Sequence, residues 1–322
     1  MKLRTAPLLA LALATTAWAA VDPASLAAAR ALYDERGKSA EAQRAFEQIA
    51  AADPKSADAQ YFLGQLALRR DDADQAVAYA EKAVALAPDN ADAQNLLGDA
   101  YGRSAQKASV FSQFGLARKC LAAYQRAVAL APEKVEIHQN LFEYYRQAPG
   151  LVGGGSDKAE AEAAAILKLD PIRGHTAYAT LYAADKKFDQ AEAHIAEIKK
   201  LDPGRGRLAA ASLFVTEKKF DQAFAEFDEV LKTAPDDYGA LYQVGRLAAV
   251  SSQNLDRGLA ALRRCLELPP GKNDPSHAAA QWRIGNLLEK KNDPAGARAA
   301  YQAALKLDPK FAQASDALNK LK

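Results

Sequence analysis

The chain has 322 residues, enough for two ordinary domains or one extended array, and its 42 Lys and Arg nearly balance its 40 Asp and Glu. Alanine is abundant and Val and Ile are sparse, which favours helix because Ala, Leu, Glu, Lys and Gln lose little conformational freedom there. A surface that neutralises phosphates needs a clear basic excess, so this balance argues against nucleic acid as a partner.

The first 19 residues have the pattern of a secretory signal peptide. Lys2 and Arg4 precede an apolar run over residues 6–14, and the sequence AWA at residues 17–19 is a small-x-small cleavage site. The run is shorter than the roughly 20 residues that span a bilayer. No cysteine lies near the cleavage site to carry a lipid. We therefore expect a periplasmic or secreted protein with no membrane anchor after cleavage.

Eight prolines, 32 to 44 residues apart, each close a helical stretch. They are Pro54, Pro88, Pro132, Pro171, Pro203, Pro235, Pro270 and Pro309. Twelve residues before each proline stands a small residue, namely Ala42, Ala76, Cys120, Ala159, Ala191, Ala223, Gly258 and Ala297. A small residue at a fixed offset predicts that two helices cross there with their backbones close together. Proline ends each second helix because it cannot continue one.

These units resemble the tetratricopeptide repeat (TPR), which carries Leu-Gly in its first helix and Ala, an aromatic, Ala and Pro in its second. The clearest matches are Leu63, Gly64, Ala76, Ala83 and Pro88 in repeat 2, and Gly285, Ala297, Tyr301, Ala304 and Pro309 in repeat 8. Repeats 1, 5 and 6 lack the glycine and have Arg30, Ala179 and Ala211 there. Repeats 5 and 6 nevertheless contain near copies, KKFDQAEAHIAEIKKLDP and KKFDQAFAEFDEVLKTAP, which indicates duplication.

The resemblance implies an all-α fold: a right-handed α-solenoid of eight helix pairs over residues 20–322, closed by a capping helix at 310–322. Such an array has no single core, because each pair buries its apolar face only against its neighbours. Members of the family usually hold an extended or helical partner segment in a concave groove lined by the first helices.

Repeats 3 and 4 are longer than the 34-residue unit, in both cases between the first and second helix. We expect long loops near residues 103–116 and 149–156, side by side on one edge of the solenoid. The first loop carries Val110, Phe111 and Phe114. We expect these three side chains to tuck under their own loop, and the alternative is a patch that faces a partner.

The second loop, PGLVGGGSDKA, contains Gly150, Gly153, Gly154 and Gly155. Gly150 and Gly155 have the spacing of a phosphate-binding loop, but Ser156 and Asp157 replace its Lys and Ser/Thr, and a carboxylate would repel phosphate. A helical rather than strand pattern precedes it. We interpret the loop as a lengthened turn in which Ser156 caps the following helix. A second possibility is that N–H groups at this helix start receive an acidic group of a partner.

Cysteine and histidine give no sign of a cross-link or a metal site. Cys120 and Cys265 lie four repeats apart, so we expect no disulfide between them. His138, His175, His194 and His277 show no metal-ligand spacing, although His175 and His194 fall on paired helices of repeat 5. No catalytic arrangement of Ser, Cys, His and carboxylates stands out. The sequence therefore predicts a protein that is not an enzyme, with no metal, cofactor or catalytic residue.

In the tetratricopeptide family the groove is lined by positions 2, 5, 9, 12 and 13 of the first helix. In this register the candidate partner-binding residues are Tyr61, Gln65, Asn95, Asp99, Gln139, Glu143, Arg146, Tyr242, Arg246, Trp282 and Asn286. Aromatic and Arg side chains anchor partners, and Asn and Gln can bond a peptide backbone. The family's carboxylate-clamp pattern is incomplete, so an acidic chain terminus is not expected. The alternative for Tyr61, Tyr242 and Trp282 is that they are packing residues displaced by one position.

The expected function is therefore a scaffold or assembly factor of the cell envelope that binds a protein or peptide segment in this groove. A small-ligand-binding or catalytic protein using the glycine-rich loop at residues 150–155 is the alternative. If that loop lay beside a concave pocket with ionisable groups, the alternative would be favoured.

Overall fold

The computed structural model describes residues 22–35, 37–271 and 273–321, and the predicted signal peptide lies outside them. Within these ranges the chain forms seventeen α-helices and one short 3-10 helix, with no strand. None of the helices in the described ranges is both long and apolar enough to cross a membrane.

The chain divides into two compact units, Met1–Ala131 and Pro132–Lys322. Unit 1 contains α1 (Pro23–Asp34), α2 (Ser39–Ala52), α3 (Ala57–Arg69), α4 (Ala73–Leu86), α5 (Ala91–Lys107) and α6 (Val110–Leu130). Unit 2 contains α7 (Val135–Gln147), η1 (Gly150–Val152), α8 (Ser156–Leu169), α9 (Pro171–Ala184), α10 (Phe188–Leu201), α11 (Pro203–Thr216), α12 (Phe220–Thr233), α13 (Tyr238–Ser251), α14 (Leu255–Glu267), α15 (His277–Lys290), α16 (Pro294–Leu307) and α17 (Ala312–Lys320).

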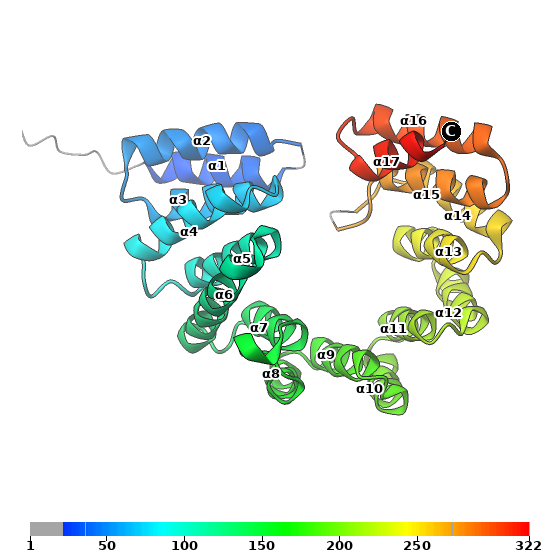
Figure 1. Cartoon of the computed structure of the whole chain (residues 1–322), viewed down its shortest axis with the longest axis horizontal. Helices are drawn as coiled ribbons and strands as arrows, with labels where there is room; N and C mark the ends of the chain where they lie inside the picture. The colour runs from blue at the N-terminus through cyan, green and yellow to red at the C-terminus, as the bar shows by residue number, and fades with distance from the viewer. Residues whose placement is uncertain (1–21, 36, 272, 322) are drawn as a thin grey trace, which may run out of the picture. The chain divides into compact units, whose positions relative to one another are not determined.

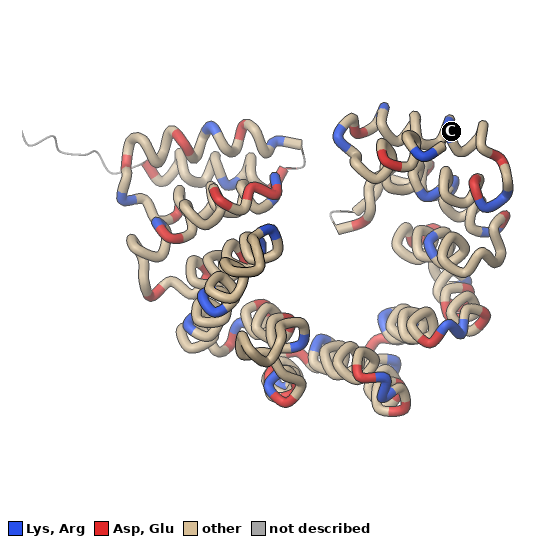
Figure 2. The backbone as a smooth tube through the Cα atoms, in the orientation of Figure 1, with Lys and Arg blue, Asp and Glu red and all other residues tan. Residues whose placement is uncertain are grey.

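The helices pair in chain order, from α1 with α2 to α15 with α16, and α17 packs on α16 (Figure 1). This confirms the predicted all-α array of eight helix pairs with a capping helix. In unit 2 the first helices of the pairs, such as α9, α11 and α13, lie on the inner side of the curve, and their partners lie outside (Figure 1). Both units carry Lys and Arg as well as Asp and Glu (Figure 2).

The small residues twelve positions before the prolines are all buried, as predicted. Seven of them are at most 2% exposed. The eighth, Gly258, shows why size matters, because a Cβ atom there would lie 2.5 Å from the Cβ of Ala248 on the facing helix. The two helices of a pair therefore cross where a larger side chain would not fit.

Repeats 4, 5 and 6 follow one another with no intervening turn. Asp170 ends α8 and also caps α9, where its carboxylate accepts the N–H of Arg173 at 3.0 Å. Asp202 has the same double role between α10 and α11. Pro171 and Pro203 then occupy the first helical position, where the missing N–H costs nothing. Because no turn separates these helices, the prolines here are only 32 residues apart, the shortest spacing in the chain.

At each of these tight junctions, the helix that follows needs a glycine near its start. A Cβ atom on Gly174 would lie 2.2 Å from the Cα of Leu167, and one on Gly206 would lie 2.5 Å from the Cα of Lys199. Both obstacles are backbone atoms, which cannot rotate away. Repeats 5 and 6 thus have a glycine of close approach, five residues before the position of the family's glycine.

The long loop predicted near residues 103–116 is wrong. α5 continues to Lys107 and α6 begins at Val110, so the insertion lengthens both helices and leaves a turn of only Ala108 and Ser109. The insertion contains no proline, and helix satisfies its backbone N–H and C=O groups better than an open loop would. The expected burial of its apolar residues is also wrong, because Val110 is 67%, Phe111 95% and Phe114 44% exposed.

Candidate functional site

Two predicted groove residues, Tyr242 and Arg246, line a cavity of about 460 Å³ in unit 2. They lie one turn apart on α13, so they share a face of that helix. The opposite wall is formed by α11 and one end by the segment before α15. The lining residues are Leu208, Ser212, Val215, Thr216, Phe227, Gly239, Tyr242, Gln243, Arg246, Leu247, Val250, Asn273, Asp274 and Pro275.

Both buried and exposed side chains line this cavity. Tyr242 is only 7% exposed and belongs to the core, whereas Val250 is 54% exposed. Arg246 is exposed, and its Nη1 donates to the neutral amide oxygen of Gln243 at 3.2 Å. A guanidinium held by an amide retains its charge, so it can bind a carboxylate or a backbone carbonyl of a partner.

Val250 also lines a second cavity of about 400 Å³, which continues the surface from α13 to α15. The predicted residue Asn286 lies there and accepts the hydroxyl of Tyr301 at 2.8 Å. Arg283 lines the same cavity, and its Nε is buried without a hydrogen-bond partner among the described residues. We name the two cavities together the α11–α15 groove.

Trp282, also predicted as a groove residue, is partly buried against a hydrophobic cluster. Its ring meets Phe311 edge-on, with centroids 6.1 Å apart, and it lies in the cluster covered by α17. The guanidinium of Arg283 sits 4.2 Å from the centre of the same ring. The core position of Tyr242 and the contacts of Trp282 are both those of the packing alternative. In α3, Tyr61 is half-buried, accepts the amide of Gln65 at 3.1 Å and stays near the surface.

The remaining candidates already bond to other parts of the chain. In unit 1, Asp99 accepts the hydroxyl of Tyr124 at 2.7 Å, and Asn95 is half-buried one turn before it. Burial raises the pKa of Asp99 to about 6, although Tyr124 and Arg103 oppose this shift. In unit 2 the members on α7 are engaged with α7 and α9: Arg146 with Glu143 at 2.5 Å, and Gln139 with Arg173 at 3.3 Å.

The glycine-rich loop is closed by its own hydrogen bonds. Its N–H groups donate inward, from Gly153 to Gly150 at 2.9 Å, from Gly154 to Pro149 at 3.2 Å and from Gly155 to Tyr145 at 2.8 Å. A Cβ atom on Gly154 would lie 1.8 Å from the carbonyl oxygen of Ala148, so only glycine fits. These three N–H donors of the loop are therefore already used.

The predicted capping role of Ser156 is wrong. Gly155, with φ of +155°, is the N-cap residue, and Ser156 is the first residue of α8. The chain must reach α8 immediately after the close approach at Gly154, which leaves no capping position for Ser156. Asp157 follows in the first turn, where its carboxylate already interacts favourably with the positive end of the helix.

The histidines and cysteines form no evident metal site. His175 and His194 face each other across α9 and α10 with their Nδ1 atoms 2.9 Å apart, and Tyr178 stacks on His194 at 4.5 Å. In the part of the chain that the structure describes, no group of three or more His, Cys, Asp or Glu could hold a metal ion. Cys120 and Cys265 are free and buried, and burial raises the pKa of each thiol to about 12.

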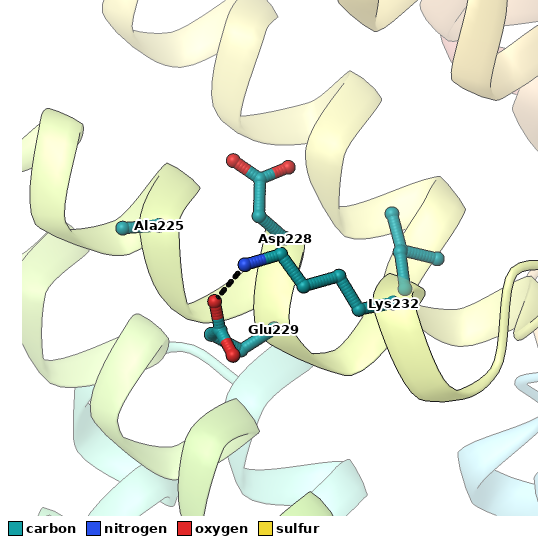
Figure 3. Close-up of a pocket in the computed structure, with 5 residues that line it drawn as sticks. Ala225, Asp228, Glu229 and Lys232 are labelled. Carbon is teal, nitrogen blue, oxygen red and sulfur yellow. Dashed lines mark hydrogen bonds and ion pairs between the residues drawn. The ribbon is translucent and has the colours of Figure 1, made fainter.

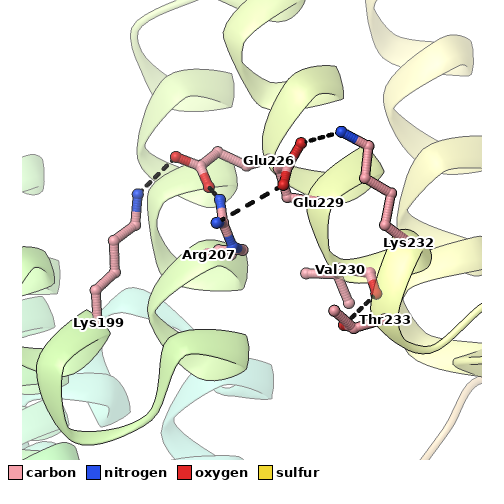
Figure 4. A network of polar contacts seen from close by, with 7 residues as sticks. All are labelled: Lys199, Arg207, Glu226, Glu229, Val230, Lys232 and Thr233. Atoms are coloured by element: carbon pink, nitrogen blue, oxygen red, sulfur yellow. Dashed lines mark hydrogen bonds and ion pairs between the residues drawn. The ribbon is translucent and has the colours of Figure 1, made fainter.

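The outer face of α12 carries a hollow whose charges are paired. It is lined by Ala225, Asp228, Glu229, Leu231 and Lys232 (Figure 3). Lys232 bonds to Glu229 (Figure 3). Beside it, Glu226 binds Lys199 at 2.6 Å and Arg207 at 3.2 Å, which ties α10 and α11 to α12 (Figure 4). Because these charges neutralise each other, we assign this face a structural role.

The fold defines a class of helical-repeat proteins, and a sequence comparison gives the family. A model described as "Tetratricopeptide repeat" matches residues 26–91, 65–108, 208–272 and 247–310. These matches cover more than half of the chain, which therefore belongs to the tetratricopeptide repeat family. No curated protein matches the sequence.

Several solved structures are similar to this chain at low sequence identity. The human IFIT1 dimer with m7Gppp-AAAA is 15% identical, with a TM-score of 0.50 over 88% of this chain and 71% of that chain. A tetratricopeptide repeat protein from Parabacteroides merdae ATCC 43184 is 15% identical, with a TM-score of 0.49 over 83% and 99%. A thermophilic TPR protein from Thermus thermophilus is 24% identical, with a TM-score of 0.49 over 60% and 98%.

The α11 wall of the groove was missed by sequence reasoning. Repeat 6 lacks the family's glycine, so no groove positions were assigned to α11, although Leu208, Ser212 and Val215 line the cavity. Two features of the sequence could have identified these α11 residues. Repeats 5 and 6 are near copies, and a glycine follows Asp-Pro in both.

Proposed function

We propose that this protein is an interaction scaffold or assembly factor of the cell envelope, and that it binds an extended partner segment in the α11–α15 groove. Tetratricopeptide repeats serve generally as non-catalytic scaffolds, which supports the first part. The signal-peptide pattern of the first 19 residues supports export. Both the location and the choice of groove are proposals.

The observation that carries the choice of groove is the placement of Arg246 and Val250 over one cavity. An exposed cation and an exposed apolar side chain share its rim, above the apolar wall of Leu208 and Val215. This arrangement suits a segment that inserts an apolar side chain and offers a carboxylate or carbonyl to Arg246. The amide of Gln243 adds a donor and an acceptor for a peptide backbone.

The catalytic alternative has less support. In the loop at residues 150–155, the N–H groups of residues 152–155 are bonded within the loop and to α7. The carbonyl of Gly153 also accepts Nζ of Lys158 at 2.8 Å, so the nearest cation is occupied as well. The α11–α15 groove, by contrast, exposes the side chain of Arg246.

Site-specific photo-crosslinking tests the groove. A photoreactive residue at position 250 should form adducts with a partner in an extract of the source cells, whereas one at Ala260, exposed on the outer helix α14, should not. Arg246→Glu should suppress the adducts, and the matched reversal Arg263→Glu on α14 should leave them unchanged. Equal adducts from positions 250 and 260, or none from 250, would reject the groove.

Cell fractionation tests the location separately. The chain should be recovered from the periplasm or medium, with its N-terminus at residue 20. An intact N-terminus on a cytoplasmic chain would reject the envelope role without affecting the groove.

A further inference from the structure

The tip of the α5–α6 hairpin exposes an unusual group of apolar side chains. Val110, Phe111 and Phe114 occupy the first turns of α6 and are 67%, 95% and 44% exposed. A phenylalanine that is almost fully exposed gains nothing for the fold, and folding alone does not account for a cluster of three. We call these three residues the aromatic tip.

Basic residues follow the aromatic tip on the same helix, and acidic residues are missing. Between Asp99 and Glu133 the sequence contains no Asp or Glu, but it has Arg103, Lys107, Arg118, Lys119 and Arg126. Phe111, Phe114 and Arg118 are spaced three and four residues apart, so they form one stripe along α6. Seven residues of helix place the Arg118 backbone about 10 Å from that of Phe111.

The charges near the tip leave a positive excess. The neighbouring α3–α4 turn contributes Asp71 and Asp72, and the start of α4 contributes Asp74. Arg70, Arg103 and Lys107 lie around them. Asp71 pairs with Lys107 at 2.7 Å and with Arg103 at 3.5 Å. Arg118 and Lys119 form no ion pair with any described residue, and Lys119 lies 5.1 Å over the ring of Tyr101. These two cations are thus available to an external anion.

We propose that the aromatic tip inserts into the surface of an anionic lipid bilayer, with Arg118 and Lys119 at the level of the phosphate groups. A separation of about 10 Å matches the depth to which interfacial apolar side chains enter a bilayer. The absence of Asp and Glu from the hairpin complements a negative surface. Three side chains at a hairpin end are also far smaller than a stable protein interface of roughly 1,200 Å² or more.

This proposal is independent of the α11–α15 groove, since the hairpin belongs to unit 1 and the groove to unit 2. It describes peripheral contact only, consistent with the lack of a spanning helix among the described residues. Its function would be to hold the scaffold at a membrane while the groove binds a partner.

Vesicle sedimentation tests the tip directly. The chain from residue 20, which retains every described residue, is mixed with phosphatidylcholine vesicles with or without about a third phosphatidylglycerol. We expect binding to the anionic vesicles only. Phe111→Ser with Phe114→Ser should weaken binding roughly tenfold or more. Arg118→Gln with Lys119→Gln should also weaken it, by about fivefold per charge removed.

Matched controls separate insertion from general stickiness. Leu307→Ser removes another exposed apolar side chain, 56% exposed on α16, and should leave vesicle binding unchanged. Trp in place of Phe111 (Phe111→Trp) should show a blue-shifted emission on binding. Equal binding of all variants, equal binding to both vesicle types, or no binding would overturn the proposal. Self-association that depends on the tip in the absence of vesicle binding would instead identify a protein contact.

Discussion

Tyr124 donates its hydroxyl to the carboxylate of Asp99 at 2.7 Å, and this bond joins the two helices of repeat 3. Burial raises the pKa of Asp99 to about 6, well above its ordinary value of 3.8. The protonated acid is therefore favoured in the folded state. The protonated Asp99 carboxyl stabilises the folded state. This stabilisation is complete below pH 3.8 and is lost as pH rises through 6.

Replacing Asp99 by Asn removes the buried charge and keeps an acceptor for Tyr124. We expect Asp99→Asn to stabilise the protein at pH 7.5 by about 1 to 3 kcal/mol, with the gain vanishing near pH 4. Thermal melting at both pH values measures this difference. A variant that is less stable than the wild type at pH 7.5 would show that ionised Asp99 is required.

The histidine pair of repeat 5 has the opposite dependence on pH. Burial, and then the nearby His175, lower the pKa of His194 below its ordinary value. Stability from the neutral ring is therefore present above pH 6.5 and is lost as pH falls through the lowered value. We expect His175→Gln to reduce the loss of melting temperature between pH 7 and pH 5. The same loss in the variant and the wild type would reject this coupling.

Two glycines of α11 give a matched test of the junction between repeats 5 and 6. Gly206→Ala places a Cβ 2.5 Å from the Cα of Lys199 and should destabilise the protein by about 1 to 3 kcal/mol. Gly204→Ala meets only Asp202 Oδ1 at 3.4 Å and should be neutral or stabilise by about 0.5 kcal/mol. Melting curves that rank the two variants in the opposite order would contradict the close approach.

The register of the repeats is tested at Ala191, which is fully buried between the helices of repeat 5. Ala191→Leu should overpack this crossing and destabilise the protein by about 1 to 3 kcal/mol. Ala193→Leu, on the exposed face of the same helix, is the control and should change stability little. If both substitutions had the same small effect on denaturant unfolding, the assigned crossing point would be incorrect.

The fold was predictable because prolines and small residues recur at fixed offsets, and each small residue lies at a helix crossing. The extension of α5 and α6 was not, because extra residues between two helices can equally lengthen a loop or the helices. The inward bonding of the glycine-rich loop depends on the approach of Gly154 to Ala148, which spacing alone does not reveal.

The groove was predictable only in part. Counting from proline selected Tyr242 and Arg246, which line one cavity because α13 follows the ordinary repeat, although Tyr242 is largely buried. The same count assigned no groove residue to α11, because this helix begins directly at Pro203 with no turn before it. Whether an aromatic side chain lines the groove or packs against other helices also depends on its neighbours. The ring of Trp282, for example, contacts Phe311 beside the capping helix.

The most direct test of the scaffold proposal is a binding measurement in solution. Titration calorimetry would use a synthetic peptide of the segment that cross-links to position 250. Arg246→Glu should weaken binding by at least roughly tenfold, since a charge-assisted contact contributes about 1.5 kcal/mol or more. Arg263→Glu should bind as the wild type does. Equal affinity of the wild type and Arg246→Glu would contradict the α11–α15 groove as the binding site.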